Sequence, residues 1–187
     1  MRLPADAVLI VIDAEEAIGP RDVASNGPEA DKNIAALVAA WRAEGLPLVH
    51  VGRQSTVPAS APAVPPLDGE IVIARDATSA FVASNLETML DALGATTLVV
   101  CGALATHALE ASARHAADLG YKVFVVADAC RAADVIDLSG RFWPAEDVRA
   151  LSLALLSGET ATIVDAATAL QAAATAKARQ RRRAGKA

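Results

Sequence analysis

The chain has 187 residues, 53% of them hydrophobic and only 3% aromatic, which is enough for one α/β-sized domain with an aliphatic core. Its net charge is −5, but residues 177–187 hold six basic side chains and no acid, so the rest of the chain carries about −11. The acidic charge of residues 1–176 argues against a protein that wraps around nucleic acid. The basic tail has too few apolar side chains to pack against the rest of the chain. We expect one domain over residues 1–175 and a disordered tail over 176–187.

The two cysteines, Cys101 and Cys130, are too few for a disulfide framework and do not have the spacing of metal ligands. The first residues lack the apolar run of a signal peptide, and no segment has the roughly eighteen uninterrupted apolar residues of a membrane span. The sequence therefore predicts a soluble, cytoplasmic protein without membrane contacts.

Buried strands and amphipathic helices alternate along the chain. The strands are expected at 7–12, 48–51, 70–74, 97–101, 122–127 and 160–164. The helices are expected at 31–44, 85–93 with Ser84 as its N-cap, 106–119, 145–156, and from Asp165 to about residue 174. Residues 56–66 contain four prolines and are expected to be an extended surface loop.

This order predicts an α/β fold of three layers, α/β/α, around a six-stranded, mostly parallel, Rossmann-like sheet with helices on both faces. In such folds ligands bind at the carboxyl ends of the strands. Asp13, Arg75, residues 102–108 and Asp128 follow predicted strands and are the positions to consider for chemistry.

Several common site motifs are absent from the sequence. No G-x-G-x-x-G, Walker loop or G-x-S-x-G follows a strand, which disfavours dinucleotide binding, NTP hydrolysis and serine-hydrolase chemistry. His50, His107 and His115 lack metal-ligand spacing and are interpreted as structural or surface histidines. We expect neither a metal nor a cofactor.

Residues 98–112 have the form of a strand, a turn at Gly102 and the start of a helix, without an obvious nucleophile. With Val11-Ile12-Asp13, Ser79-Ala80-Phe81 and Val126-Ala127-Asp128, this segment makes the chain resemble isochorismatase-like cysteine hydrolases from about residue 7 to 170. The resemblance implies an Asp after the first strand, a Lys six residues before the Phe, and a Cys six residues after the Gly.

In this register, Asp13 matches the family Asp, but Arg75 stands in place of the Lys and Ala108 in place of the Cys. Shifting the alignment by one residue would place Leu109, instead of Ala108, at the position of the Cys. Neither side chain is a nucleophile. The candidate binding residues at the same edge are Glu15, Phe81, Leu104, Thr106 and His107.

A methyl group cannot form the family's thioester, and loss of the nucleophile from such a unit typically costs on the order of 10⁶ in rate. Arginine stays protonated, so Arg75 can hold an anion but cannot shuttle a proton. Cys101 and Cys130 are interpreted as inert core residues. Isochorismatases proper also carry a small residue at the Cys position and use acid chemistry, but they keep the Lys.

Three hypotheses remain at this point. The chain is a hydrolase that acts on a small molecule without a cysteine, with Asp13 as proton donor or acceptor and Arg75 as anion anchor. Alternatively, it is a catalytically silent family member that binds a small molecule or a partner subunit, or it is another small-molecule enzyme. The resemblance implies a homodimer or homotetramer, and Phe142-Trp143-Pro144 is either part of an interface or part of the core.

Overall fold

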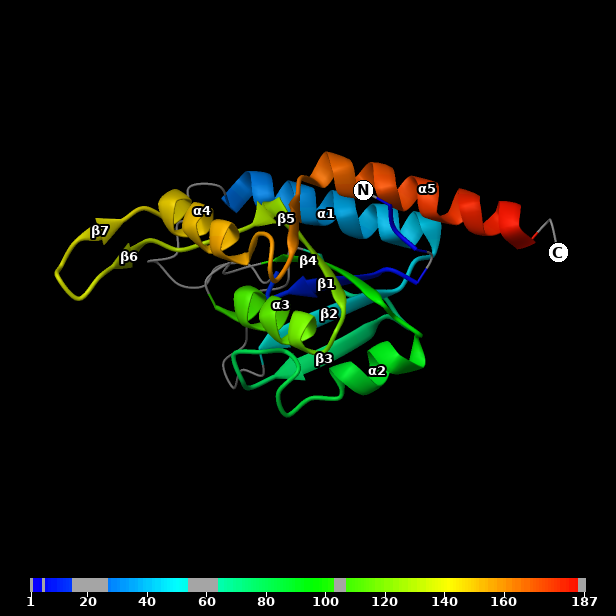
Figure 1. Ribbon diagram of the computed structural model, residues 1–187, viewed down its shortest axis with the longest axis horizontal. Helices are drawn as coiled ribbons and strands as arrows, with labels where there is room; N and C mark the ends of the chain where they lie inside the picture. Colours follow the sequence, from blue (N-terminus) through cyan, green and yellow to red (C-terminus); the bar gives the residue numbers. More distant parts are fainter. Residues whose placement is uncertain (1, 5, 15–26, 54–63, 103–106, 185–187) are drawn as a thin grey trace.

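A parallel sheet forms the centre of the molecule in the computed structural model, which describes residues 2–4, 6–14, 27–53, 64–102 and 107–184, with side chains through residue 176 (Figure 1). Its strands lie in the order β3 (Ile71–Arg75), β2 (Leu48–Arg53), β1 (Val8–Ile12), β4 (Thr97–Gly102), β5 (Lys122–Cys130) and β8 (Thr162–Val164). All five neighbouring pairs are parallel. β1 and β4 are buried along their whole length, as expected for central strands covered on both faces.

Helices cover the two faces of the sheet and complete the three layers that the sequence predicts. On one face lie α1 (Gly27–Glu44) and α5 (Ala166–Ala184), and on the other lie α2 (Leu86–Ala92), α3 (Ala108–Asp118) and α4 (Ala145–Leu156). Alternate residues of β1 enter the two cores, with Leu9 and Val11 facing α1 and Ile10 facing the α2 and α3 side. Trp41 of α1 is fully buried and donates from Nε1 to the Ala7 carbonyl over 3.2 Å.

Several element boundaries differ from the sequence-based expectation. α5 runs to Ala184, through much of the segment expected to be a disordered tail, because Ala, Lys, Arg and Gln are strong helix formers. Asn85, not Ser84, is the N-cap of α2, although Ser84 Oγ accepts the Leu86 N–H over 3.3 Å. β5 continues to Cys130, past the expected end at residue 127.

A small hairpin, β6 (Val135–Ile136) and β7 (Phe142–Trp143), projects from the sheet next to α4 (Figure 1). The sequence predicts no strand between residue 127 and the helix at 145–156. The Asp137 carboxylate closes the turn by accepting the backbone N–H groups of Ser139 at 2.8 Å and Arg141 at 3.1 Å and the Trp143 indole N–H at 2.9 Å. Its bonds to Ser139, Trp143 and Arg141 lower the pKa of Asp137 to about 2.

Candidate active site

Asp13 and Arg75 meet at the carboxyl edge of the sheet. Asp13 directly follows β1, and its backbone N–H donates to the Val51 carbonyl of β2 over 2.8 Å. Arg75 is the last residue of β3, so its side chain crosses the end of β2 to reach Asp13. The sequence placed both residues at this edge, and the structure brings them into direct contact.

The two side chains form a bidentate ion pair. Arg75 Nε donates to Asp13 Oδ1 over 3.1 Å, and Arg75 Nη2 donates to Asp13 Oδ2. Arg75 Nη1 donates to the Ala77 carbonyl over 2.9 Å. The side chains of Arg75 and Asp13 are only 9% and 8% exposed, so the pair is shielded from water and salt. Both carboxylate oxygens of Asp13 and three of the five guanidinium N–H groups are therefore engaged within the protein.

The backbone of Asp13 is also unusual. Its φ is +47°, in the left-handed region that few residues other than glycine adopt. Asp is among the side chains that tolerate this region best, and the contact with Arg75 fixes its position here. Such backbone conformations cluster at functional sites.

Ala108 is the first residue of α3, at the same edge of the sheet. It is 1% exposed and belongs to the core cluster that includes Leu109 and Ala113. β4 ends at Gly102, where φ is +132° and an added Cβ would lie 1.9 Å from the Ile12 carbonyl oxygen. β4 can therefore run this close to β1 only with glycine at its end.

The Ser79-Ala80-Phe81 segment is anchored to α3. Ser112 Oγ accepts the Ala80 N–H over 2.9 Å, and Ser79 Oγ lies 3.1 Å from His115 Nδ1. The Phe81 ring is buried, with its centroid 5.3 Å from that of His115. Phe81 thus packs against α3, and its expected role in ligand binding stays a prediction.

His107 is exposed at the N-cap of α3 and lines a groove that the sequence did not predict. The other candidate binding residues, Glu15, Leu104 and Thr106, lie outside the described residues. Asp128, which the sequence places after a strand, lies within β5 and has a structural role, because its Oδ1 accepts the Ala166 N–H at the start of α5 over 2.7 Å.

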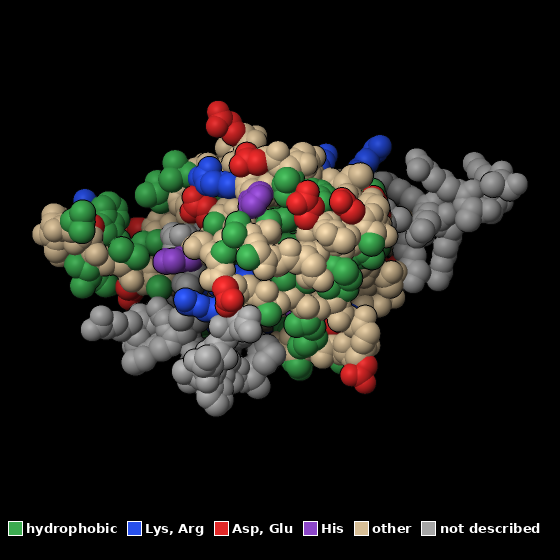
Figure 2. All heavy atoms as spheres, turned by 90° about the horizontal axis from the view of Figure 1, so that it is seen from below, with side chains coloured by type: hydrophobic (Ala, Val, Ile, Leu, Met, Phe, Trp, Pro, Cys, Tyr) green, Lys and Arg blue, Asp and Glu red, His purple; other side chains and the backbone are tan. Residues whose placement is uncertain are grey.

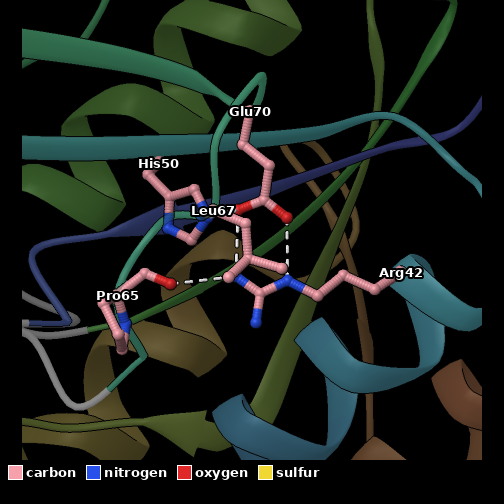
Figure 3. Close-up of polar contacts among 5 residues, drawn as sticks. All are labelled: Arg42, His50, Pro65, Leu67 and Glu70. Atoms are coloured by element: carbon pink, nitrogen blue, oxygen red, sulfur yellow. Dashed lines mark hydrogen bonds and ion pairs between the residues drawn. The ribbon is translucent and has the colours of Figure 1, made fainter.

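A second cluster of charged side chains, partly buried and centred on Glu70, was missed by sequence reasoning (Figure 3). Glu70 Oε1 accepts Arg42 Nε–H over 2.7 Å, and Oε2 lies 2.8 Å from His50 Nε2 and accepts the Leu67 N–H over 2.9 Å. Hydrogen bonds from Arg42, and then from Leu67 and His50, lower the pKa of Glu70 to about 2. This cluster joins α1, β2 and the segment before β3, and it confirms that His50 is a satisfied structural histidine.

Both cysteines are buried, and no disulfide joins them. Burial raises the pKa of Cys101 well above its ordinary value and that of Cys130 to about 12. Their burial confirms the interpretation of both as core residues, and the raised pKa values agree with the expectation that they are inert. Among the residues of the structure's described ranges, no helix is both long and apolar enough to cross a membrane.

The family model for the isochorismatase domain matches residues 7–168. The chain belongs to the isochorismatase family. It is 27% identical over 168 residues to the isochorismatase family protein YrdC of Bacillus subtilis, covering 83% of this chain and 90% of YrdC. It is 31% identical over 169 residues to YddQ of the same organism, covering 83% of this chain and 93% of YddQ.

Solved structures of isochorismatase-family proteins have the same fold. A protein of this family from Chromobacterium violaceum superposes with a TM-score of 0.88 at 35% identity, covering 94% of this chain and 97% of that one. An isochorismatase from Pseudomonas putida superposes with a TM-score of 0.83 at 31% identity, covering 90% and 92%. The predicted three-layer fold and the family assignment are thus confirmed.

Proposed function

We propose that this isochorismatase-family protein binds a small anionic molecule at the carboxyl edge of the sheet and does not carry out cysteine-dependent hydrolysis. The observation that best supports this proposal is the buried ion pair of Asp13 with Arg75, at the edge of the sheet where α3 begins with Ala108. In the register that the resemblance implies, the family's three catalytic positions hold a carboxylate that is already paired, a cation that cannot give up its proton, and a methyl group.

The ion pair supports a binding role over a catalytic one. A carboxylate that activates water or protonates a substrate needs a free oxygen directed at the reacting atom. Both oxygens of Asp13 are held by Arg75. Arg75 keeps two guanidinium N–H groups beyond those bound to Asp13 and Ala77, and these are suited to a carboxylate ligand.

One observation favours a second candidate, hydrolysis by acid chemistry with Asp13 as the proton donor. The left-handed backbone of Asp13 is a strained feature at the end of a central strand, and strain of this kind is often retained for function. In this candidate the substrate would have to separate Asp13 from Arg75 before the reaction.

A ligand screen by thermal shift tests the binding role. Small carboxylates and amides are added to the native protein and to Asp13→Asn, which releases the guanidinium of Arg75. At ten times its Kd a ligand adds about 1.4 kcal/mol, which raises the Tm by roughly 3–6 °C for a domain of this size. We expect carboxylates to raise the Tm of Asp13→Asn more than that of the native protein. Asp118→Asn, an exposed change at the far end of α3, is the matched control.

An activity assay with isochorismate and with amide substrates separates the two candidates. The proposal predicts no turnover above background by the native protein. Turnover that Asp13→Asn abolishes and Asp118→Asn leaves intact would establish the acid mechanism instead. If no carboxylate or amide shifts the Tm of either protein, the binding role is wrong.

A further inference from the structure

Arg53, the last residue of β2, lies beside Arg75 at the carboxyl edge of the sheet. β2 is the strand between β1, which Asp13 follows, and β3, which Arg75 ends. In the pairing of β2 with β3, the Cα atoms of Arg53 and Arg75 are direct partners. Neighbouring strands are about 4.8 Å apart, so the two arginines start from adjacent backbone positions. Figure 2 shows Lys and Arg side chains, in blue, at the left of the molecule, on the side where the strands end in Figure 1.

The two arginines also lie on the same face of the sheet. Val51 and Ile73, two residues earlier on their strands, belong to the core cluster on the α2 and α3 side. Because side chains alternate along a strand, Arg53 and Arg75 fall on this face as well. Arg53 is therefore on the side of the sheet where α3 begins with Ala108, and not on the side that α1 covers.

The charges of the two arginines are balanced unequally. Asp13 engages Arg75 with both of its carboxylate oxygens. Arg53 is exposed, and within the described parts of the chain its side chain has no ion pair or hydrogen bond. Like charges at neighbouring positions of two strands are destabilising, so Arg53 adds repulsion that no described contact offsets. Of the described charges at the ends of β1, β2 and β3, one positive charge is thus left uncompensated.

We propose that Arg53 is a second anion-binding residue of this site, and that it makes the site select a carboxylate over the corresponding neutral amide. The inference rests on the anion-binding role proposed above for Arg75 and adds the residue that sets the preference for charge. A carboxylate supplies the missing negative charge, and its two oxygens can accept from Arg53 and from the two N–H groups that Arg75 has left. An amide offers one oxygen, and its NH₂ group would face a guanidinium that has no acceptor.

The different exposure of the two arginines gives the proposal a measurable signature. The side chains of Arg75 and Asp13 are only 9% and 8% exposed, so salt screens their ion pair little. Arg53 is exposed, so salt screens its attraction for an anion. Binding of a carboxylate should therefore depend on salt through Arg53 and lose this dependence when the charge of Arg53 is removed.

Isothermal titration calorimetry with matched acids and amides tests the proposal. The probes are acetate with acetamide, butanoate with butanamide, and benzoate with benzamide. At low salt the native protein should bind the acid of a pair more tightly than its amide. Arg53→Gln should weaken binding of the acid about tenfold and leave binding of the amide unchanged, and Arg53→Lys, which keeps the charge, should retain part of the preference. Raising NaCl from about 0.05 to 1 M should weaken binding of the acid to the native protein and have little effect on Arg53→Gln.

The matched control is Arg2→Gln, which removes an exposed arginine on the amino side of β1. Loss of the preference for the acid in Arg53→Gln, with Arg2→Gln like the native protein and no fall in the Tm of unliganded Arg53→Gln, supports the proposal. Equal binding of the acid by the native protein and Arg53→Gln overturns it and leaves anion binding by Arg75 standing. If no acid binds the native protein, the role of Arg53 is also wrong, and the thermal-shift screen of Asp13→Asn shows separately whether Arg75 binds anions.

Discussion

Replacing Asp13 by Asn tests the buried ion pair that defines the candidate site. Asn is the appropriate change because it keeps the size of the side chain and tolerates the left-handed φ of +47°. It removes the negative charge and turns one oxygen into an N–H donor that faces Arg75. The guanidinium, whose side chain is 9% exposed, is then a buried and only partly satisfied cation.

The expected loss of stability follows from this geometry. Removing one partner of a buried pair typically costs about 3–5 kcal/mol, and the remaining amide oxygen of Asn recovers part of it, so we expect about 2–4 kcal/mol at neutral pH. For a domain of this size the Tm should fall by roughly 5–15 °C. Urea denaturation at one fixed protein concentration measures the free energy of unfolding.

The second variant, Arg75→Gln, completes a double-mutant cycle with Asp13→Asn. Removing both charges should restore part of the stability, with a coupling energy above about 1 kcal/mol. The exposed control Asp118→Asn should change stability by less than about 0.5 kcal/mol. If Asp13→Asn were as stable as that control, the ion pair would not hold this edge of the sheet together and the reasoning would be refuted.

Three further predictions concern other parts of the fold. Gly102→Ala should cost more than about 3 kcal/mol in urea denaturation, because its Cβ would lie 1.9 Å from the backbone of β1, whereas Gly120→Ala, with a φ of +90° but open space, should cost about 1–2 kcal/mol. Glu70→Gln should lower stability by about 1–2 kcal/mol at pH 7. Because the pKa of Glu70 is lowered from 4.5 to about 2, this difference should disappear as the pH falls through that range, and a pH-independent difference would contradict it. Asp137→Asn should speed amide hydrogen exchange in the hairpin turn and leave the sheet amides unchanged; equal protection in both proteins would show that the carboxylate does not hold the turn.

The sequence was sufficient to predict the sheet and to place Asp13 and Arg75 at the same edge of it. Continuous Val, Ile and Leu runs mark strands that are buried on both faces, and residues that follow such strands meet at one edge. The bidentate geometry could not be predicted, because it depends on the side chain of β3 crossing the end of β2 to reach β1.

The Glu70 cluster and the hairpin show why the rest could not be predicted. Arg42 and Glu70 are 28 residues apart, and no periodicity connects a helix side chain to the first residue before a strand. The hairpin did leave a local signal, since Asp137 followed by Ser139-Gly140 is typical of a turn and apolar pairs flank it. Its strands have two residues each, too few for an alternating pattern to show.

We propose that Ala108 stands at the family's nucleophile position on an otherwise retained scaffold. The most direct test is the double variant Ala108→Cys with Arg75→Lys, titrated by the ultraviolet absorbance of the thiolate. Cys101 and Cys130 should contribute no thiolate absorbance near neutral pH, because burial raises the pKa of both. We expect the pKa of the introduced thiol, at the N-terminus of α3 and near a lysine, to lie at least one pH unit below the ordinary cysteine pKa of about 8.5. An unshifted or raised value in a folded double variant would contradict it.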